Sequence, residues 1–96
     1  MKKILVNKCY GGFSFSEEMK KELGARLGCE ILWDDDYATD PVAIDLFEER
    51  GSKWVSGRRA KLELVELPDE TTDWCLEEYD GMEQIVYVVD GKLHWA

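Results

Sequence analysis

The sequence predicts an α+β fold in which two helices pack on a mixed or antiparallel sheet that ends in a three-stranded β-meander. Two segments have the cap residues and the apolar spacing of helices. Two Asp-Gly pairs, Asp80-Gly81 and Asp90-Gly91, separate strand-like segments near the C-terminus. The chain has 96 residues, which suits one hydrophobic core, so we expect residues 1–96 to form a single domain.

The N-terminal part of the chain predicts a strand followed by a helix. Residues 2–8 are expected to form the strand, because the continuous apolar run at 4–6 suits burial on both faces. The helix is expected to begin after Ser16, whose hydroxyl is a good N-cap acceptor, and to end at Gly28. Its core-facing side chains, at helical spacing, are Met19, Leu23 and Leu27.

The middle of the chain predicts a second strand, an acidic loop and a second helix. Residues 29–33 form a short apolar segment typical of a strand. The acidic loop after it contains Asp34, Asp35 and Asp36. Asp40 is expected to cap the second helix, with Pro41 in its first position, where a missing N–H is harmless. The helix is expected to end at Gly51, and the polar residues 52–59 to form a loop.

The last third of the chain predicts four strands. Residues 61–67 alternate between apolar and polar side chains. The two Asp-Gly pairs suit type I′ hairpin turns, because both turn positions need positive φ. They join three strands, at residues 74–79, 82–89 and 92–95, into a meander. Its middle strand is apolar on both sides, so one face is expected to cover the helices and the other to be half exposed.

The chain is strongly acidic, with 12 Lys and Arg against 21 Asp and Glu and a formal net charge of −9. This charge disfavours direct binding to nucleic acid and to anionic membranes, since both attract basic surfaces. It favours a basic protein partner, which long-range attraction would steer to the chain. The alternative is that the charge serves solubility alone, as in many intracellular proteins.

Three cysteines, Cys9, Cys29 and Cys75, are far apart in sequence and odd in number. Because the N-terminus has no signal-peptide pattern, we expect free thiols in a reducing cytoplasm. No apolar run approaches the roughly 18 residues that a membrane span needs. One histidine and no cysteine pair at ligand spacing argue against a zinc site, so we expect neither metal nor cofactor.

The most distinctive part of the sequence is residues 9–14, called here the glycine segment. A glycine turn before a helix presents backbone N–H groups and partial positive charge, which suit a phosphate or carboxylate. The same field could activate the Cys9 thiol as a nucleophile. The alternative is a tight turn that only glycines can make, with Cys9 as a small buried side chain. The candidate ligand-binding residues are Cys9, Tyr10, Gly11, Gly12, Phe13 and Ser14.

A basic cluster stands out in this acidic chain, with Arg58 and Arg59 at its centre and Lys53 and Lys61 beside them. A guanidinium could clamp an anion held by the glycine segment. Alternatively, the cluster pairs with the acidic residues 34–36 or is a solvated loop.

Four tryptophans are many for a chain of this length. Either they build the core, or those that are exposed mark a protein interface or a stacking platform. They are Trp33, Trp54, Trp74 and Trp95.

Four segments together resemble a family of small uncharacterised proteins of tailed phages and prophages. In order, they are Asn7-Lys8-Cys9-Tyr10-Gly11-Gly12-Phe13-Ser14, Thr39-Asp40-Pro41, Glu48-Glu49-Arg50-Gly51 and Glu78-Tyr79-Asp80-Gly81-Met82-Glu83. Members of that family tend to have a basic residue before the Asp-Pro pair and a basic tail with Trp. This chain instead has acidic residues before Asp40 and ends in Leu93-His94-Trp95-Ala96. The resemblance implies a phage context and no particular activity.

The charge and the resemblance lead to one favoured function and two alternatives. The favoured function is a non-catalytic accessory protein that binds and blocks a host or defence protein, with residues 34–36 as candidate partner-binding residues. The first alternative binds or sequesters a phosphorylated metabolite or nucleotide signal between the glycine segment and Arg58 or Arg59. The second is an enzyme that uses Cys9. A hairpin edge would also suit a homodimer.

Overall fold

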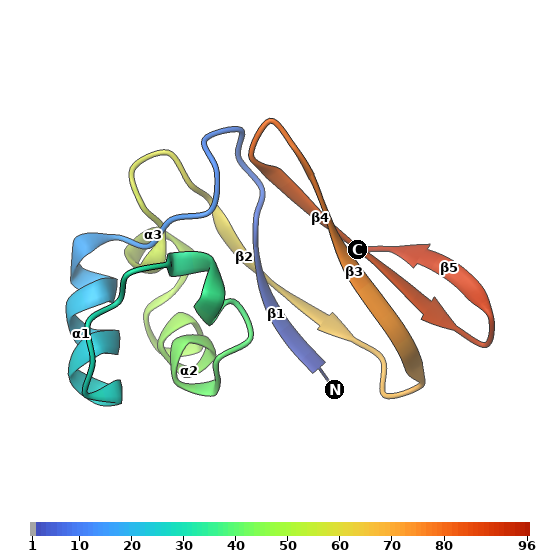
Figure 1. Cartoon of the computed structure of the whole chain (residues 1–96), viewed down its shortest axis with the longest axis horizontal. Helices are drawn as coiled ribbons and strands as arrows, with labels where there is room; N and C mark the ends of the chain where they lie inside the picture. Colours follow the sequence, from blue (N-terminus) through green and yellow to red (C-terminus); the bar gives the residue numbers. More distant parts are fainter. Residues whose placement is uncertain (1) are drawn as a thin grey trace.

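The computed structural model describes residues 2–96 and confirms the α+β class (Figure 1). The elements follow in the order β1 (Lys2–Asn7), α1 (Glu17–Leu27), the 3₁₀ helix η1 (Asp34–Tyr37), α2 (Pro41–Arg50), α3 (Ser52–Val55), β2 (Leu62–Leu67), β3 (Thr71–Tyr79), β4 (Met82–Val89) and β5 (Lys92–Trp95). All strand pairings among these residues are antiparallel, in one sheet of β1 and β2 and another in the order β3-β4-β5. The mixed-sheet alternative is therefore excluded for this part of the chain.

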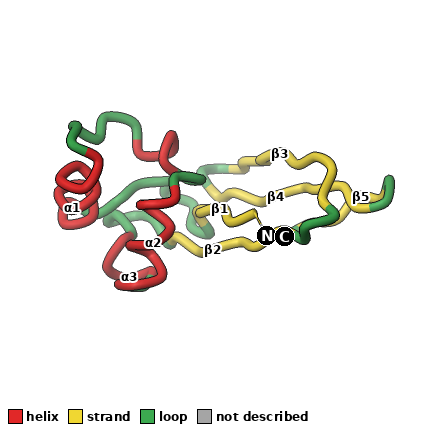
Figure 2. The backbone as a smooth tube through the Cα atoms, turned by 90° about the horizontal axis from the view of Figure 1, so that it is seen from below, coloured by secondary structure: helices red, strands yellow, loops and turns green. Residues whose placement is uncertain are grey.

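The β1–β2 pair lies between the helices and the β3–β5 sheet (Figure 1 and Figure 2). On one side, Leu5 and Leu62 belong to the core that the helices form. On the other side, Ile4 and Val6 pack with Ile85 of β4 in a second buried cluster. Both faces of β1 are therefore buried, as its continuous apolar run predicts. The meander covers this strand pair, so the prediction that it covers the helices is wrong.

The predicted helix caps are present in the structure. The Ser16 hydroxyl accepts a hydrogen bond from the Met19 N–H at 3.0 Å, and α1 is followed by Gly28 with φ 72°. The Asp40 carboxylate accepts two backbone N–H groups of the first turn of α2, and Pro41 opens that helix. These local signals are enough to position both helix starts.

The prediction of a strand at residues 29–33 is wrong. This segment is irregular, and Asp34–Tyr37 after it forms η1 instead of a loop. Ile31 is buried, whereas Leu32 and Trp33 are 67% and 70% exposed. One anchored side chain is enough to hold this segment on the core, so its short apolar run does not produce strand pairing.

The prediction of a loop at residues 52–59 is wrong for the first half of this segment, where Ser52–Val55 forms the short helix α3. Val55 is fully buried in the helical core, and the Trp54 side chain packs against the same core. The sequence did not predict this turn of helix because the segment is mostly polar, and only Trp54 and Val55 of α3 contribute apolar contacts. The rest of the segment is irregular and leads into β2.

The meander forms through both predicted turns. Asp80 and Gly81 have φ values of 50° and 86°, and Asp90 and Gly91 have 52° and 73°, as type I′ turns require. Strand β3 begins at Thr71, earlier than predicted. The turn between β3 and β4 brings the meander to the loop that follows β1, where the candidate site lies.

Candidate functional site

The glycine segment lies against the turn between β3 and β4, so two distant parts of the chain meet there (Figure 1). A Cβ atom on Gly81 would lie 2.5 Å from the Gly12 nitrogen. A Cβ atom on Gly11 would overlap the carbonyl oxygen of Arg59. Gly11 and Gly81 are therefore needed for close approach of the backbone, which gives the segment a structural role.

Asn7 joins the glycine segment to its neighbours through a buried polar network. The residue is 0% exposed, and its Nδ2 donates to the Cys9 and Gly81 carbonyl oxygens, each at 2.6 Å. Its Oδ1 accepts from the Cys9 N–H at 3.3 Å and from the Lys61 N–H at 2.9 Å. Its own N–H donates to Oε1 of Glu83 at 2.8 Å. One residue thus connects β1, the glycine segment, the loop before β2 and the hairpin.

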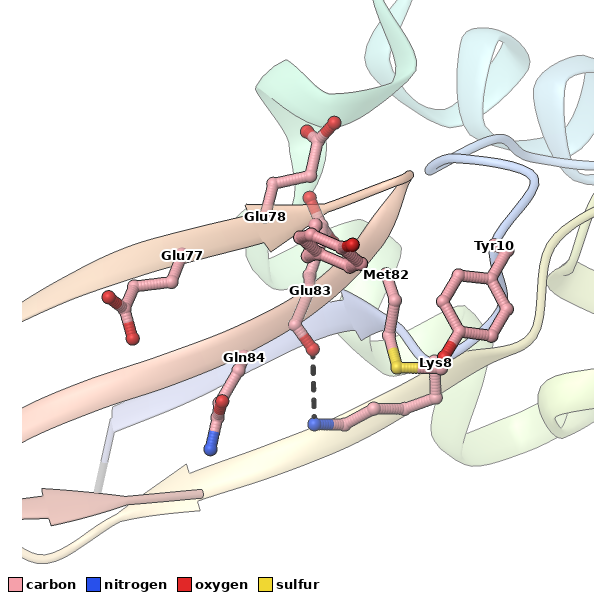
Figure 3. A pocket seen from close by; sticks show the side chains of 8 residues that line it. Lys8, Tyr10, Glu77, Glu78, Met82, Glu83 and Gln84 are labelled. Carbon is pink, nitrogen blue, oxygen red and sulfur yellow. Dashed lines mark hydrogen bonds between the residues drawn. The ribbon is translucent and has the colours of Figure 1, made fainter.

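Glu83 places a carboxyl group, with the residue only 5% exposed, beside this network. Burial is the main cause that raises the pKa of Glu83 above its ordinary value of 4.5, and the charges of Glu78 and Asp35 add to the effect. The Asn7 N–H and the Lys8 ammonium act in the opposite direction. The Lys8 ammonium also donates to the backbone oxygen of Glu83 at 3.2 Å (Figure 3). Ionising Glu83 therefore costs folding free energy.

We expect Glu83→Gln to flatten the dependence of stability on pH. The raised pKa means that the folded chain holds this proton more tightly than the unfolded chain does. The cost of ionisation is absent below the unfolded pKa, near 4.5, and complete above the raised folded pKa. The free energy of unfolding of the parent should therefore fall as pH rises through that window.

Urea unfolding at a series of pH values measures this decline. Glu83→Gln should remove it, while Glu77→Gln, a change at an exposed residue of β3, should leave it in place. An undiminished decline in the Glu83→Gln variant would show that another group is responsible.

An open groove of about 570 Å³ lies between the glycine segment and the β3–β4 hairpin (Figure 3). Its lining residues are Lys8, Tyr10, Glu77, Glu78, Tyr79, Met82, Glu83 and Gln84. Three glutamates against one lysine make the groove poorly suited to an anion. Sequence reasoning missed it, because its two sides are far apart in the chain and meet only in the fold.

The fold brings part of the predicted ligand site together. Gly11 and Arg59 are adjacent, and both Arg58 and Arg59 are exposed on the loop before β2. Within residues 2–96, the N–H groups of Gly11 and Gly12 donate no hydrogen bond to another protein group. These observations agree with the geometry that the small-ligand alternative requires.

The other predicted ligand residues are dispersed. Cys9 is partly buried, and Tyr10 is 65% exposed and lines the groove. Phe13 packs against the helical core. The Ser14 carbonyl accepts a hydrogen bond from the Gly57 N–H at 2.8 Å, which ties the segment to the loop before β2. These four residues therefore do not converge on one cavity.

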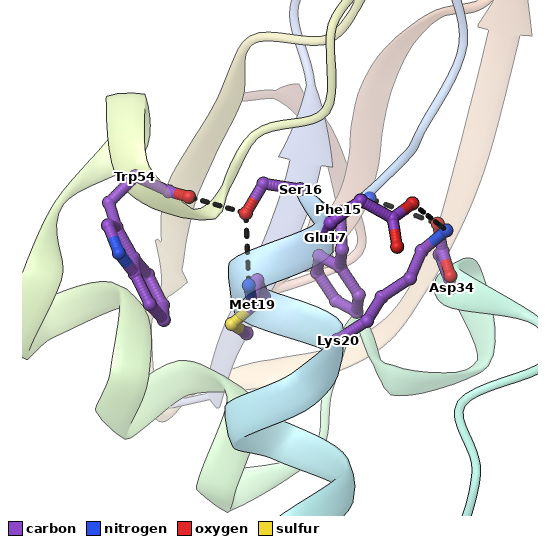
Figure 4. Close-up of polar contacts among 7 residues, drawn as sticks. All are labelled: Phe15, Ser16, Glu17, Met19, Lys20, Asp34 and Trp54. Atoms are coloured by element: carbon purple, nitrogen blue, oxygen red, sulfur yellow. Dashed lines mark hydrogen bonds and ion pairs between the residues drawn. The ribbon is translucent and has the colours of Figure 1, made fainter.

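Protein groups already satisfy the start of α1 (Figure 4). The Phe15 N–H donates to Oδ2 of Asp34 at 3.0 Å, and the Lys20 ammonium lies 3.7 Å from the same oxygen. The Ser16 hydroxyl donates to the Trp54 carbonyl oxygen at 2.7 Å while it caps the helix. A carboxylate thus occupies this end of the glycine segment, which disfavours a second anion there.

The three acidic residues predicted to bind a partner do not act as a unit. The Asp34 carboxylate accepts the hydrogen bond from the Phe15 N–H, so it is used inside the fold. Asp35 and Asp36 are exposed on η1. Two exposed carboxylates on one turn of helix form a small acidic surface. The larger concentration of charge lies elsewhere.

Most of the net charge lies on the meander layer, which we define as residues 69–96. This layer has eight Asp and Glu against one lysine, Lys92, hence a net charge of −7 out of −9 for the chain. The acidic residues are Asp69, Glu70, Asp73, Glu77, Glu78, Asp80, Glu83 and Asp90. The acidic excess around residues 66–78 can be counted in the sequence, but only the fold shows that residues 69–96 form one layer.

The outer face of the meander, which points away from β1 and β2, is exposed and partly apolar. Cys75 pairs with Val86, and Val86 pairs with Trp95 across the three strands. Val88 pairs with Leu93 in the next row. Paired residues share one face of a sheet, so these side chains form a continuous patch. Leu93 and Trp95 are 59% and 57% exposed.

No protein-family model matches the chain, and no curated protein or solved structure is significantly similar to it. Residues 2–96 hold no cluster of three or more side chains arranged to bind a metal ion. The helices within this range are too short or too polar to cross a bilayer.

Proposed function

We propose that this chain is a non-catalytic binding protein that covers a basic surface of a partner protein and thereby blocks it. The observation that carries the proposal is the net charge of −7 on the meander layer, in a chain of net charge −9. Concentrated charge on one layer attracts an oppositely charged surface and orients it during encounter.

The exposed side chains of the same layer support a protein as the partner. Leu93 and Trp95 are more than half exposed, and Tyr79 is 75% exposed. Aromatic side chains are enriched among residues that dominate protein interfaces. The resemblance to tailed-phage proteins makes a host or defence protein the expected partner, inside the host cytoplasm.

A small anionic ligand at the glycine segment is the second candidate function. The adjacency of Gly11 and Arg59 and the free N–H groups of Gly11 and Gly12 favour it. It ranks second because the Asp34 carboxylate lies at the end of the segment and the adjacent groove is acidic. Both features repel an anion.

Affinity capture from bacterial lysate, with two variants of equal charge, tests the proposal. Glu70→Gln with Glu77→Gln removes two charges from the meander layer, and Glu30→Gln with Asp36→Asn removes two exposed charges outside it. The parent and the second variant should retain the same basic protein, which salt of about 0.5 M should release by screening. The meander variant should retain clearly less.

Two results would refute the proposal. One is that the parent retains nothing above an unrelated acidic protein used as a control. The other is that all three chains retain the same protein equally, because binding would then be independent of the charge on the meander layer.

A further inference from the structure

We propose that the outer face of the meander is the contact surface, and that its occupant is a basic protein surface with an apolar centre. This inference rests on the proposed function. It adds where on this chain the partner binds and which chemical character the partner's surface has. It assigns binding to side chains that neither the glycine segment nor residues 34–36 include.

The strand register defines the patch. The outer row at the middle of the sheet is Cys75, Val86 and Trp95, and the row beside it places Asp73, Val88 and Leu93 side by side. The next row toward the groove pairs Glu77 with Gln84, and Tyr79 pairs with Met82 at the turn. The apolar members of the face are Cys75, Met82, Val86, Val88, Leu93 and Trp95.

Burial separates this face from the inner one. Ile85 is fully buried on the inner face, and the Tyr87 and His94 rings stack there with centroids 5.2 Å apart. On the outer face, Cys75 and Trp95 are exposed at the two ends of one row. Of the apolar members of this face, Cys75, Leu93 and Trp95 are exposed and Met82, Val86 and Val88 are partly exposed, so a contact with a partner would remove apolar area from water.

Charge indicates which partner fits. The strands of the meander carry Asp73 and Glu77 and no Lys or Arg on the outer face, since the one lysine of the layer, Lys92, pairs with Val89 on the inner face. Lys8, which lies outside the layer, lines the groove beside Glu77. The turn residue Asp90 borders the patch at its far end. An apolar centre beside carboxylates is complementary to apolar side chains surrounded by Lys and Arg.

The same charge disfavours a second copy of the chain. Two outer faces placed together would bring the Asp73 and Glu77 carboxylates of one copy against those of the other, in layers that each have a net charge of −7. Like charges across an interface cost binding free energy, and little screening remains once the interface is desolvated. A basic partner is therefore the occupant that the surface fits, and a homodimer through this face is not expected.

Trp95 is expected to be the residue that contributes most to binding. Its 57% exposed side chain stands beside Val86 and near Leu93, so a partner can enclose it on several sides. Tryptophan residues enclosed in this way are often those whose truncation weakens binding most. Trp33 offers a matched control, because it is 70% exposed but lies next to η1.

Two peptides of equal charge test the apolar part of the inference. The probe is Arg-Arg-Leu-Trp-Leu-Arg-Arg, and its control is Arg-Arg-Ser-Gly-Ser-Arg-Arg. The probe should bind the parent about tenfold more tightly than the control peptide does, as measured by NMR titration. Trp95→Ala should remove most of this difference, whereas Trp33→Ala should keep it.

A labelling experiment tests the location without truncating a tryptophan. Cys9→Ser with Cys29→Ser leaves Cys75 as the one thiol, at one end of the middle row of the proposed face, and Cys9→Ser with Cys75→Ser leaves the exposed Cys29 beyond α1. A bulky maleimide on Cys75 should abolish binding of the probe peptide. The same label on Cys29 should leave it unchanged.

The outcomes separate this inference from the proposed function. Equal affinity of both peptides, with no effect of Trp95→Ala or of the Cys75 label, overturns the inference but leaves charge-driven binding intact. Failure of both peptides to bind at low salt overturns the inference and removes support from the proposed function. Preferential binding of the probe, lost on labelling Cys75 but not Cys29, supports the inference.

Discussion

Gly81→Ala is expected to lower the free energy of unfolding by about 3 kcal/mol, although the change adds a single methyl group. Part of this cost is the positive φ of 86° at this position, which is strained for alanine. The larger part is contact, since the new Cβ would lie 2.5 Å from the Gly12 nitrogen and 2.7 Å from the Tyr10 carbonyl oxygen. The glycine segment would have to move away from the hairpin.

Gly91→Ala provides the matched control for this effect. Gly91 occupies the same position of the other Asp-Gly turn and has φ 73°, but a Cβ added there would meet no atom within 4 Å. Its cost should therefore be the conformational part alone, about 1 kcal/mol. Urea midpoints of the two variants measure the difference. Equal midpoints would contradict the close approach of the hairpin turn to the glycine segment.

Asn7→Asp is expected to destabilise the chain by about 4 kcal/mol at neutral pH, although it hardly changes the side-chain volume. The amide donates to the Cys9 and Gly81 carbonyl oxygens, each at 2.6 Å, and a carboxylate oxygen would repel both. A second negative charge would also lie beside the buried Glu83 carboxyl group. Charge burial and lost donors act in the same direction.

Ser56→Ala serves as the control, because the Ser56 hydroxyl accepts one backbone hydrogen bond, from the Leu62 N–H at 2.8 Å. Losing one such bond should cost about 1 kcal/mol. Chemical denaturation of both variants gives the comparison. A cost for Asn7→Asp no larger than that for Ser56→Ala would mean that Asn7 does not hold the junction together.

The features that sequence reasoning predicted correctly depend on short-range interactions. Ser16 and Asp40 cap helices through N–H groups two or three residues ahead, and Asp80-Gly81 adopts its turn through its own φ preferences. Each of these signals can be read within a few residues. Burial of both faces of β1 was predictable for the same reason.

The features that sequence reasoning missed depend on which distant segments meet. The contact of Gly12 with Gly81 and the hydrogen bond from Asn7 Nδ2 to the Gly81 carbonyl oxygen exist only after the hairpin docks on the loop after β1. Periodicity carries no information about that docking. The strand prediction for residues 29–33 was wrong for a related reason. Burial of Ile31 alone holds this segment on the core, and this competes with strand pairing.

The candidate site was predictable only in part. Arg59 does lie beside Gly11, as the small-ligand hypothesis requires. The acidic residues 34–36 form a conspicuous run in the sequence because they are consecutive, yet Asp34 is used inside the fold. The charges of the meander layer are spread over several strands, and only strand pairing shows that Cys75, Val86 and Trp95 share one face.

The most direct test of the central claim is a map of amide chemical shifts during titration with the peptide Arg-Arg-Leu-Trp-Leu-Arg-Arg. The account predicts that the largest changes fall on β3, β4 and β5, around Cys75, Val86 and Trp95, while α1 and α2 remain unchanged. Largest changes at Asp35 and Asp36, or at the glycine segment, with an undisturbed meander would contradict it.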